Sequence, residues 1–161
     1  MTDAEIVDGL TDVQALALTM WGEARGDARE GHSSLEERVA VGCVVRNRTK
    51  YPTRWRESLK GVCLQPAQFS CWNVSDPNRP ALLATAHLLI TGQPTKDALA
   101  DETLYLAAGI ASGVVRDTTA GATHYLTAEL LGSSRRPAWS RTLRQVCAIG
   151  GHVFFVEPKE G

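Results

Sequence analysis

The sequence predicts an α+β domain that is mainly helical and carries a small antiparallel β-sheet late in the chain. Two observations lead to this prediction. Apolar residues recur at helical spacing through the first two thirds of the chain, whereas two short runs, 122–126 and 146–156, concentrate β-branched and aromatic residues. The chain has 161 residues, of which 43% are hydrophobic and 22% charged. This size and composition are those of one globular domain, so we expect residues 1–161 to form a single domain.

The first helix is expected to begin after Thr11 and to end at Gly26. Residues 11–14 read Thr-Asp-Val-Gln, a capping box in which Thr11 is the N-cap and the Gln14 side chain bonds back to it. Apolar residues then repeat at helical spacing, and Gly26 is a typical C-terminal stop. The helix closes with Trp-Gly-Glu-Ala-Arg-Gly at 21–26, which places Glu23 in the last turn.

A second helix is expected from about Leu35 to Asn47, with Ser34 beginning another capping box. Its 39–45 run is apolar nearly all round, so this helix should lie at the centre of the core. Further helices are expected at about 54–62, 80–91 and 101–112. The 63–78 segment should be mostly irregular, because prolines interrupt it.

The late part of the chain predicts a β-hairpin. Gly150-Gly151 separates two short runs of β-branched and aromatic residues, which is typical of a tight turn between antiparallel strands. The order of elements, helices first and strands last, suits an α+β enzyme whose cleft lies between the helices and the small sheet.

The functional interpretation depends on Glu23. A carboxyl group that is half-wrapped in apolar surface near the negative end of a helix dipole has a raised pKa. A glutamate that keeps its proton near neutral pH can give it to a leaving oxygen. Arg25 acts in the opposite direction, since a nearby positive charge favours the ionised form. The alternative is that Glu23 is an ordinary solvated residue in a last turn.

Several segments, in the same order, resemble the spore cortex-lytic type of cell wall hydrolase family. They are EARG at 23–26, the small-apolar helix ending in Asn-Arg at 47–48, Tyr-Pro at 51–52, Val62 with QPAQFSCW at 65–72, GATHY at 121–125, Trp139 and IGGHVFF at 149–155. The resemblance covers about residues 14–155. It implies a lysozyme-like arrangement of the helices and the sheet. We expect the whole chain to be the catalytic domain, without a separate wall-binding module.

The resemblance implies that the substrate is the glycan strand of peptidoglycan. The reaction would cleave its β-1,4 bond between N-acetylmuramic acid and N-acetylglucosamine, with Glu23 as general acid and base. A muramidase commonly adds a second carboxylate, whereas a lytic transglycosylase uses the deprotonated glutamate to activate the sugar's own 6-hydroxyl. No second carboxylate is convincingly placed, and Asp27 and Glu30 are the first to consider. This mildly favours transglycosylation, and both routes stay open.

Six side chains are predicted to contact the substrate: Gln68, Phe69, Ser70, Trp72, His124 and Tyr125. The 65–72 segment offers aromatic faces to sugar rings and offers amide and hydroxyl groups for hydrogen bonds. A place in the core is the alternative for its aromatic residues. In the family, the 121–125 stretch lines the cleft, which implies substrate contact or positioning of Glu23 for its last two residues. Asn47 is predicted to act behind the site, bracing the cleft from the second helix.

Composition and motifs weigh against several other classes of protein. The formal net charge of −1 gives no general attraction to nucleic acid. No histidines pair at i, i+4 and no Cys-x-x-Cys occurs, so we expect neither a metal site nor a cofactor. Two alternatives stay open: a metal-dependent wall amidase, and a non-catalytic module that binds wall glycan and uses Glu23 only as a hydrogen-bond acceptor.

The sequence also suggests where the protein works. The first residues are acidic with no apolar stretch after them, and no apolar run approaches the length of a membrane span. We therefore expect synthesis in a host cytoplasm, action on the cell wall after release, and a phage endolysin as the simplest identity. A monomer without membrane insertion is expected.

Cys63 and Cys71 flank a loop and could form a disulfide bond in an oxidising compartment. In a protein made in the cytoplasm, we expect both to be reduced thiols at first.

Overall fold

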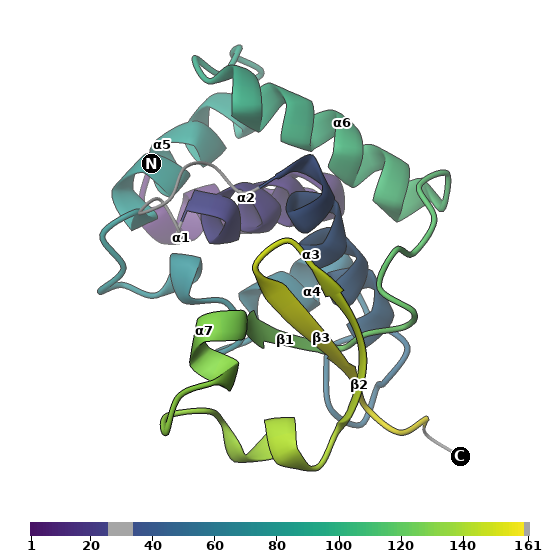
Figure 1. Cartoon of the computed structure of the whole chain (residues 1–161). Helices are drawn as coiled ribbons and strands as arrows, with labels where there is room; N and C mark the ends of the chain where they lie inside the picture. The colour runs from purple at the N-terminus through teal and green to yellow at the C-terminus, as the bar shows by residue number, and fades with distance from the viewer. Residues whose placement is uncertain (26–33, 160–161) are drawn as a thin grey trace.

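Helix α2 (Asp12–Arg25) runs through the middle of the fold (Figure 1). The fold is taken from a computed structural model that describes residues 1–25 and 34–159. Every residue of α2 from Ala15 to Gly22 is buried, so the helix is covered on all sides. The helices packed against it are α3 (Leu35–Arg48), α4 (Leu59–Leu64), α5 (Arg79–Ile90) and α6 (Ala98–Ser112). None of the helices in these described ranges is long and apolar enough to cross a membrane.

Both predicted capping boxes begin helices where the sequence placed them. The Thr11 N–H donates to Gln14 Oε1 at 2.9 Å, and the Gln14 N–H donates to Thr11 Oγ1 at 3.2 Å. Ser34 Oγ accepts from the Glu37 N–H at 3.2 Å at the start of α3. These side chains satisfy backbone donors that the first helical turn leaves without partners. The expectation that the 39–45 run is central is also confirmed, since all seven of its residues are buried.

Other helix boundaries differ from those predicted. Helix α4 begins at Leu59 with Ser58 as its N-cap, five residues later than expected, because the 54–58 segment is folded into turns. Helix α6 begins three residues early, since Asp97 caps it by accepting from two backbone N–H groups. The sequence did not reveal the short helices, which have too few turns to display a period: α1 (Asp3–Asp8), α7 (Ala128–Leu131), η1 (Ser70–Trp72) and η2 (Ala138–Arg141).

The predicted late sheet is present and antiparallel. Its strands are β1 (His124–Thr127), β2 (Arg144–Ile149) and β3 (His152–Val156), in the order β1-β3-β2. The hairpin between β2 and β3 turns at Gly150-Gly151, and β2 carries an irregularity between Gln145 and Cys147. The central strand β3 is the most buried of the three, because both of its neighbours pair with it and both of its faces are covered.

Each face of the sheet packs on a different part of the chain. Phe154 packs with Ala40 and Val44 of α3, and Tyr125 joins this cluster from β1. The opposite face is covered by the segment that includes α7 and η2, through a cluster of Leu126, Val153, Phe155, Leu130, Leu131, Trp139 and Leu143. Since successive strand residues face opposite sides, neighbours on β1 belong to different layers.

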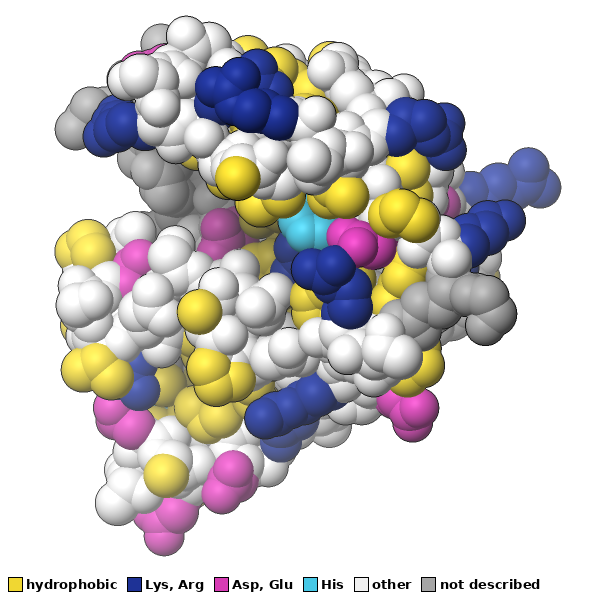
Figure 2. Space-filling model, turned by 90° about the horizontal axis from the view of Figure 1, so that it is seen from below, with side chains coloured by type: hydrophobic (Ala, Val, Ile, Leu, Met, Phe, Trp, Pro, Cys, Tyr) yellow, Lys and Arg dark blue, Asp and Glu magenta, His cyan; other side chains and the backbone are white. Residues whose placement is uncertain are grey.

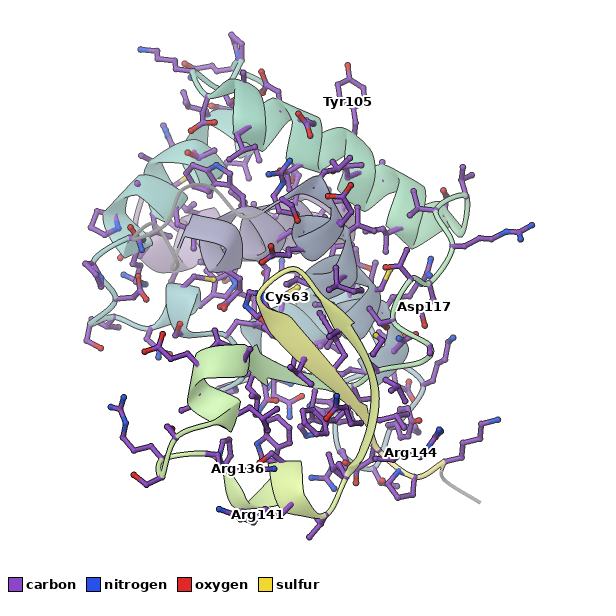
Figure 3. The ribbon with its side chains drawn as sticks, viewed as in Figure 1. Cys63, Tyr105, Asp117, Arg136, Arg141 and Arg144 are labelled. Atoms are coloured by element: carbon purple, nitrogen blue, oxygen red, sulfur yellow. The ribbon has the colours of Figure 1, made fainter. Side chains whose placement is uncertain are left out.

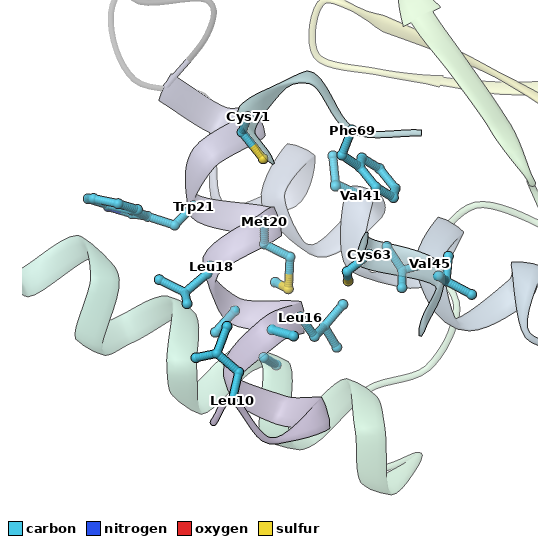
Figure 4. Packing of buried hydrophobic residues seen from close by; sticks show 14 of the residues in the cluster. Leu10, Leu16, Leu18, Met20, Trp21, Val41, Val45, Cys63, Phe69 and Cys71 are labelled. Atoms are coloured by element: carbon cyan, nitrogen blue, oxygen red, sulfur yellow. The ribbon is translucent and has the colours of Figure 1, made fainter. Parts of the chain in front are cut away.

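The main core lies between α2 and the elements around it. Figure 4 shows Leu16, Leu18 and Met20 of α2 among side chains that come from α3, α4 and the loop after α4. A side-chain contact outside this core fastens the sheet to the helices. His152 Nδ1 lies 2.9 Å from Glu37 Oε2, which joins the β2–β3 hairpin to the first turn of α3. The result is a helical body with a small sheet held on one side of it (Figure 1).

Replacement of Gly42 by alanine should destabilise the fold. A Cβ atom at this position in α3 would lie 2.6 Å from Ile110 Cδ1 and 2.8 Å from Met20 Sδ, so these two fully buried side chains would have to shift. Overpacking of this kind costs about 1–3 kcal/mol. Urea unfolding of Gly42→Ala should therefore show a lower midpoint with an unchanged slope.

Gly132→Ala is the matched control. A Cβ at Gly132 would meet its nearest neighbour at 3.7 Å, an ordinary contact, and its φ of −79° suits any residue. This variant should unfold at the wild-type midpoint. Equal midpoints for both variants would contradict the close packing of α2, α3 and α6.

Candidate active site

Glu23 lies in the last turn of α2, between the η1 turn and the sheet. Its Oε1 atom accepts a hydrogen bond from the backbone N–H of Cys71, with an N···O distance of 3.5 Å. Its Oε2 atom accepts from the hydroxyl of Tyr125 on β1, at 3.4 Å. The carboxyl group is thus flanked by two donors that come from elements far away in the sequence, and both approach it only because the domain is folded.

Burial decides the protonation of Glu23. Desolvation raises the pKa of this carboxyl, and the hydrogen bonds from Cys71 and Tyr125 lower it by a smaller amount. Both bonds are longer than the usual 2.7–3.2 Å of such contacts, which explains why they do not offset the loss of water. The negative charge of Asp76 raises the pKa further. The net result is a carboxyl group that holds its proton at higher pH than an exposed glutamate does.

The two donors to Glu23 also differ in the kinds of hydrogen bond that they can make. The Cys71 N–H can only donate, so Oε1 must stay an acceptor whether or not Glu23 carries a proton. The Tyr125 hydroxyl can rotate and either donate or accept. The proton of the neutral carboxyl group therefore belongs on Oε2, the oxygen beside Tyr125.

Gly22 permits the close approach of η1 to α2. A Cβ atom at Gly22 would lie 2.9 Å from Cys71 Cβ, too near for any side chain. The absence of a side chain at this position brings the Cys71 backbone close enough to reach Glu23. The glycine that precedes the carboxylate is thus part of the geometry of the site.

The 65–72 segment reaches Glu23 through the backbone N–H of Cys71, and its side chains face different ways. Phe69 is only 3% exposed and belongs to the core, which is the alternative that the sequence left open for it. Gln68 is engaged within the protein, since its Oε1 accepts from Trp55 Nε1 at 3.0 Å. Trp72 is partly buried, and its Nε1 donates to Thr19 Oγ1 at 2.9 Å. Ser70 is exposed at the start of η1.

Arg48 is a buried cation that the sequence-based list of site residues did not include. It is 7% exposed, and its guanidinium lies 5.0 Å from the centre of the Trp55 ring and 5.1 Å from that of Phe69. Its Nε donates to the carbonyl of Thr123 at 2.8 Å, and its Nη1 donates to Gln68 Oε1 at 3.3 Å. Arg48 therefore joins the 65–72 segment to the residue before β1. The signal in the sequence that could have singled out Arg48 is its position as a charged residue at the end of an apolar helix.

His124 and Tyr125 are neighbours in sequence but lie on opposite faces of β1. The His124 ring packs against Trp55 and Trp139, with centroids 5.5 Å and 4.8 Å away, while Tyr125 points toward Glu23. Burial, with help from the charges of nearby arginines, lowers the pKa of His124 to about 4, so the ring is neutral at pH 7. The structure thus separates two residues that the sequence had grouped in one cleft wall, and only Tyr125 reaches Glu23.

Asn47 holds the loop that precedes β1 in place. Its Nδ2 donates to Asp117 Oδ2 and to the carbonyl of Ala122, both at 3.0 Å. Burial alone would raise the pKa of Asp117, but hydrogen bonds from Thr119, Asn47 and Gly121 lower it overall. The bonds from Asn47 fix the loop that leads into the strand carrying Tyr125.

The two candidates for a second carboxylate, Asp27 and Glu30, lie outside the described residues. Within residues 1–25 and 34–159, Asp76 is the carboxylate whose charge acts on Glu23. Its Oδ1 accepts from the Asn78 N–H at 2.8 Å in the loop after η1. Over the same ranges, no three histidine, cysteine or acidic side chains form a group that could hold a metal ion.

The cysteines near the site are thiols. All four cysteines of the chain are free, so Cys63 and Cys71 form no disulfide in this structure. Burial raises the pKa of Cys63 to about 12, and burial together with the charge of Glu23 raises that of Cys71. Both thiols are therefore protonated at neutral pH and act as small apolar side chains.

The surface near the lower part of the molecule is hollowed. Figure 2 looks at this face from below and shows a notch between two lobes, with an acidic side chain at its inner end.

Comparisons with known proteins give a family and a fold. The family described as Cell Wall Hydrolase matches residues 32–155, a range that begins after Glu23. Two solved structures are similar, and both are SleB catalytic domains. That of Bacillus anthracis, a germination-specific lytic transglycosylase, is 22% identical, with a TM-score of 0.53 over 89% of this chain and 93% of that one. That of Bacillus cereus is 23% identical, with a TM-score of 0.56 over 89% and 88%. No curated protein matches the chain.

The buried carboxyl group should weaken the fold at neutral pH. Because the folded-state pKa of Glu23 is raised, the fold favours the protonated form, and its stability falls as pH rises through that pKa. Glu23→Gln stays neutral, so its melting temperature should exceed that of the wild type at pH 7, and the difference should vanish near pH 4. Each kcal/mol relieved corresponds to about 2–4 °C.

The control for this measurement is Glu36→Gln, the same substitution at an exposed position in the first turn of α3. It should not raise the melting temperature at pH 7, since no desolvation is relieved. A Glu23→Gln protein that melts at or below the wild-type temperature at pH 7 would contradict the assignment of Glu23 as a destabilised buried acid.

Proposed function

Because this chain belongs to the cell wall hydrolase family, we propose that it cleaves the glycan strands of peptidoglycan and that Glu23 is the general acid and base. The observation that carries this proposal is the carboxyl group at the end of α2, whose pKa is raised by burial and which accepts hydrogen bonds from two polar groups. The likeness to catalytic domains of SleB, one of them described as a lytic transglycosylase, supports the same reaction class.

In the first step, protonated Glu23 gives its Oε2 proton to the oxygen of the β-1,4 bond between N-acetylmuramic acid and N-acetylglucosamine. The bond between that oxygen and C1 of the muramic acid breaks, and the electron pair leaves with the oxygen. Positive charge develops at C1 while Glu23 becomes a carboxylate. Tyr125 then donates to the newly charged Oε2, so its hydroxyl can follow the change in charge at Glu23.

In the second step, the Glu23 carboxylate takes a proton from the group that attacks C1. If that group is the 6-hydroxyl of the same sugar, the product has an anhydro-muramic end, as in a lytic transglycosylase. If it is water, the product has a reducing muramic end, as in a muramidase. In both routes Glu23 recovers its proton, and one residue serves as acid and then as base.

The remaining roles follow from position. Tyr125 approaches Glu23 from the sheet, and Ser70 and Trp72 are the neighbours of Cys71 in η1, so we assign these three residues contact with the sugar chain. Gln68 and Phe69 contribute through the packing around Arg48, and His124 through the aromatic layer beneath β1. Asn47 positions the loop that leads to Tyr125.

The test is mass spectrometry of the soluble fragments that the protein releases from purified peptidoglycan. We expect wild-type protein and Glu36→Gln to release glycan fragments, and Glu23→Gln to be slower by about 10²–10⁴-fold, the usual contribution of a general acid. Anhydro-muramic ends would assign transglycosylation, and reducing muramic ends would assign hydrolysis.

Other results would replace the proposal. Equal release by wild type and Glu23→Gln would remove Glu23 from the chemistry. Fragments with intact glycan and cut peptide, lost after treatment with a chelator, would show a metal-dependent amidase. Tight binding with no release by any of the three proteins would show a non-catalytic binding module.

A further inference from the structure

The segment between Leu130 and Val156 carries a local excess of positive charge. It contains four arginines and no aspartate or glutamate, although the whole chain has a net charge of −1. We call these residues the arginine strip: Arg135, Arg136, Arg141 and Arg144. The positive charge of the strip is therefore local and does not reflect an excess of basic residues in the whole chain.

The arginines of the strip are available to a ligand. Arg135, Arg141 and Arg144 are exposed, and Arg136 is partly buried. Within residues 1–25 and 34–159, none of the four forms an ion pair with a carboxylate. Arginines elsewhere do so, as the pairs Arg38–Glu102, Arg54–Glu157 and Arg79–Asp3 show.

The backbone that carries the strip is fixed to the sheet. Trp139 packs against His124 and Phe155, with ring centroids 4.8 Å and 5.3 Å away. Arg136 bonds back to Ser140, donating from Nε to its Oγ at 3.0 Å and from Nη2 to its carbonyl at 2.9 Å. The charges therefore project from an ordered surface rather than from a loose loop.

The strip belongs to the segment that covers the sheet on the face opposite the one that Tyr125 occupies. Helix α7 follows directly after β1, the strand that carries Tyr125, and the strip follows α7. In Figure 3 the labels of Arg136 and Arg141 lie below α7, and that of Arg144 lies at the lower end of the sheet, where β2 begins. Figure 2 views the molecule from below and shows basic side chains at several places on the same face as the notch.

The substrate class assigned to Glu23 carries matching charge. A peptidoglycan strand bears short peptide stems on its muramic acid residues, and each stem has free carboxylates. Guanidinium groups pair with carboxylates through two parallel hydrogen bonds, and exposed pairs are weak singly but add along a repeating polymer. Resting on the proposed function, we propose that the arginine strip binds the carboxylates of the peptide stems and so adds to the affinity of the protein for the strand.

The proposal is tested with proteins that carry Glu23→Gln, so that the polymer is not degraded during the measurement. Their binding to purified peptidoglycan sacculi, freed of other wall polymers, is followed by co-sedimentation at several salt concentrations. Adding Arg141→Glu and Arg144→Glu should weaken binding by about fivefold or more at low salt. The effect should shrink as salt rises, because exposed charges are screened.

A matched control carries Lys50→Glu and Arg116→Glu, two exposed positions outside the strip. It has the same change in net charge and should bind as the parent does. If the charge reversals at 141 and 144 unfold the protein, as thermal melting would reveal, the pair Arg141→Gln and Arg144→Gln replaces them. A second polymer, with its stem carboxylates converted to amides, should bind parent and strip variant equally weakly.

Three outcomes would overturn the proposal: equal binding of the strip variant and its parent, equal losses in the strip and control variants, or undiminished binding to the amidated polymer. Release of fragments by the wild type is measured in parallel. If the wild type releases fragments and any of these outcomes is found, the proposed role of the arginine strip is overturned while the proposed function stands. Neither binding nor release by the wild type would overturn both.

Discussion

The carboxyl group of Glu23 must stay largely out of water at the end of the central helix, with no ion pair among the described residues to compensate. Loss of hydration raises its pKa, and the two long hydrogen bonds from Cys71 and Tyr125 leave that rise in place. The surrounding packing supplies the stability that this arrangement costs. Helix α2 is buried from Ala15 to Gly22, so the helix that carries Glu23 is anchored in the core.

Three features bring partners to that carboxyl group. Gly22 lets η1 approach α2 closely, which places the Cys71 N–H on Oε1. Arg48 connects the 65–72 segment to Thr123, and Asn47 fixes the loop before β1, so Tyr125 enters from a strand whose position is set by α3. The site is thus assembled by contacts between elements that are distant in sequence, and the helices and the sheet meet at Glu23.

Local signals predicted much of the fold. Capping boxes at Thr11 and Ser34 located two helices, and the Gly150-Gly151 turn located the hairpin, because these features depend on adjacent residues. Phe69 and Arg48 could not be placed this way, since their burial is decided by distant packing partners. The separation of His124 from Tyr125 was predictable, because consecutive residues of a strand face opposite sides, but both had been assigned to the cleft from resemblance.

The central claim is that burial keeps a proton on Glu23 at a pH where exposed glutamates are ionised. Its most direct test is a carbon-13 NMR titration of the glutamate carboxyl groups, in which the resonance absent from Glu23→Gln identifies Glu23. The account predicts a midpoint clearly above that of the exposed glutamates. A Glu23 resonance that titrates with them, or below them, would contradict it and leave the carboxyl group with no special capacity to act as an acid.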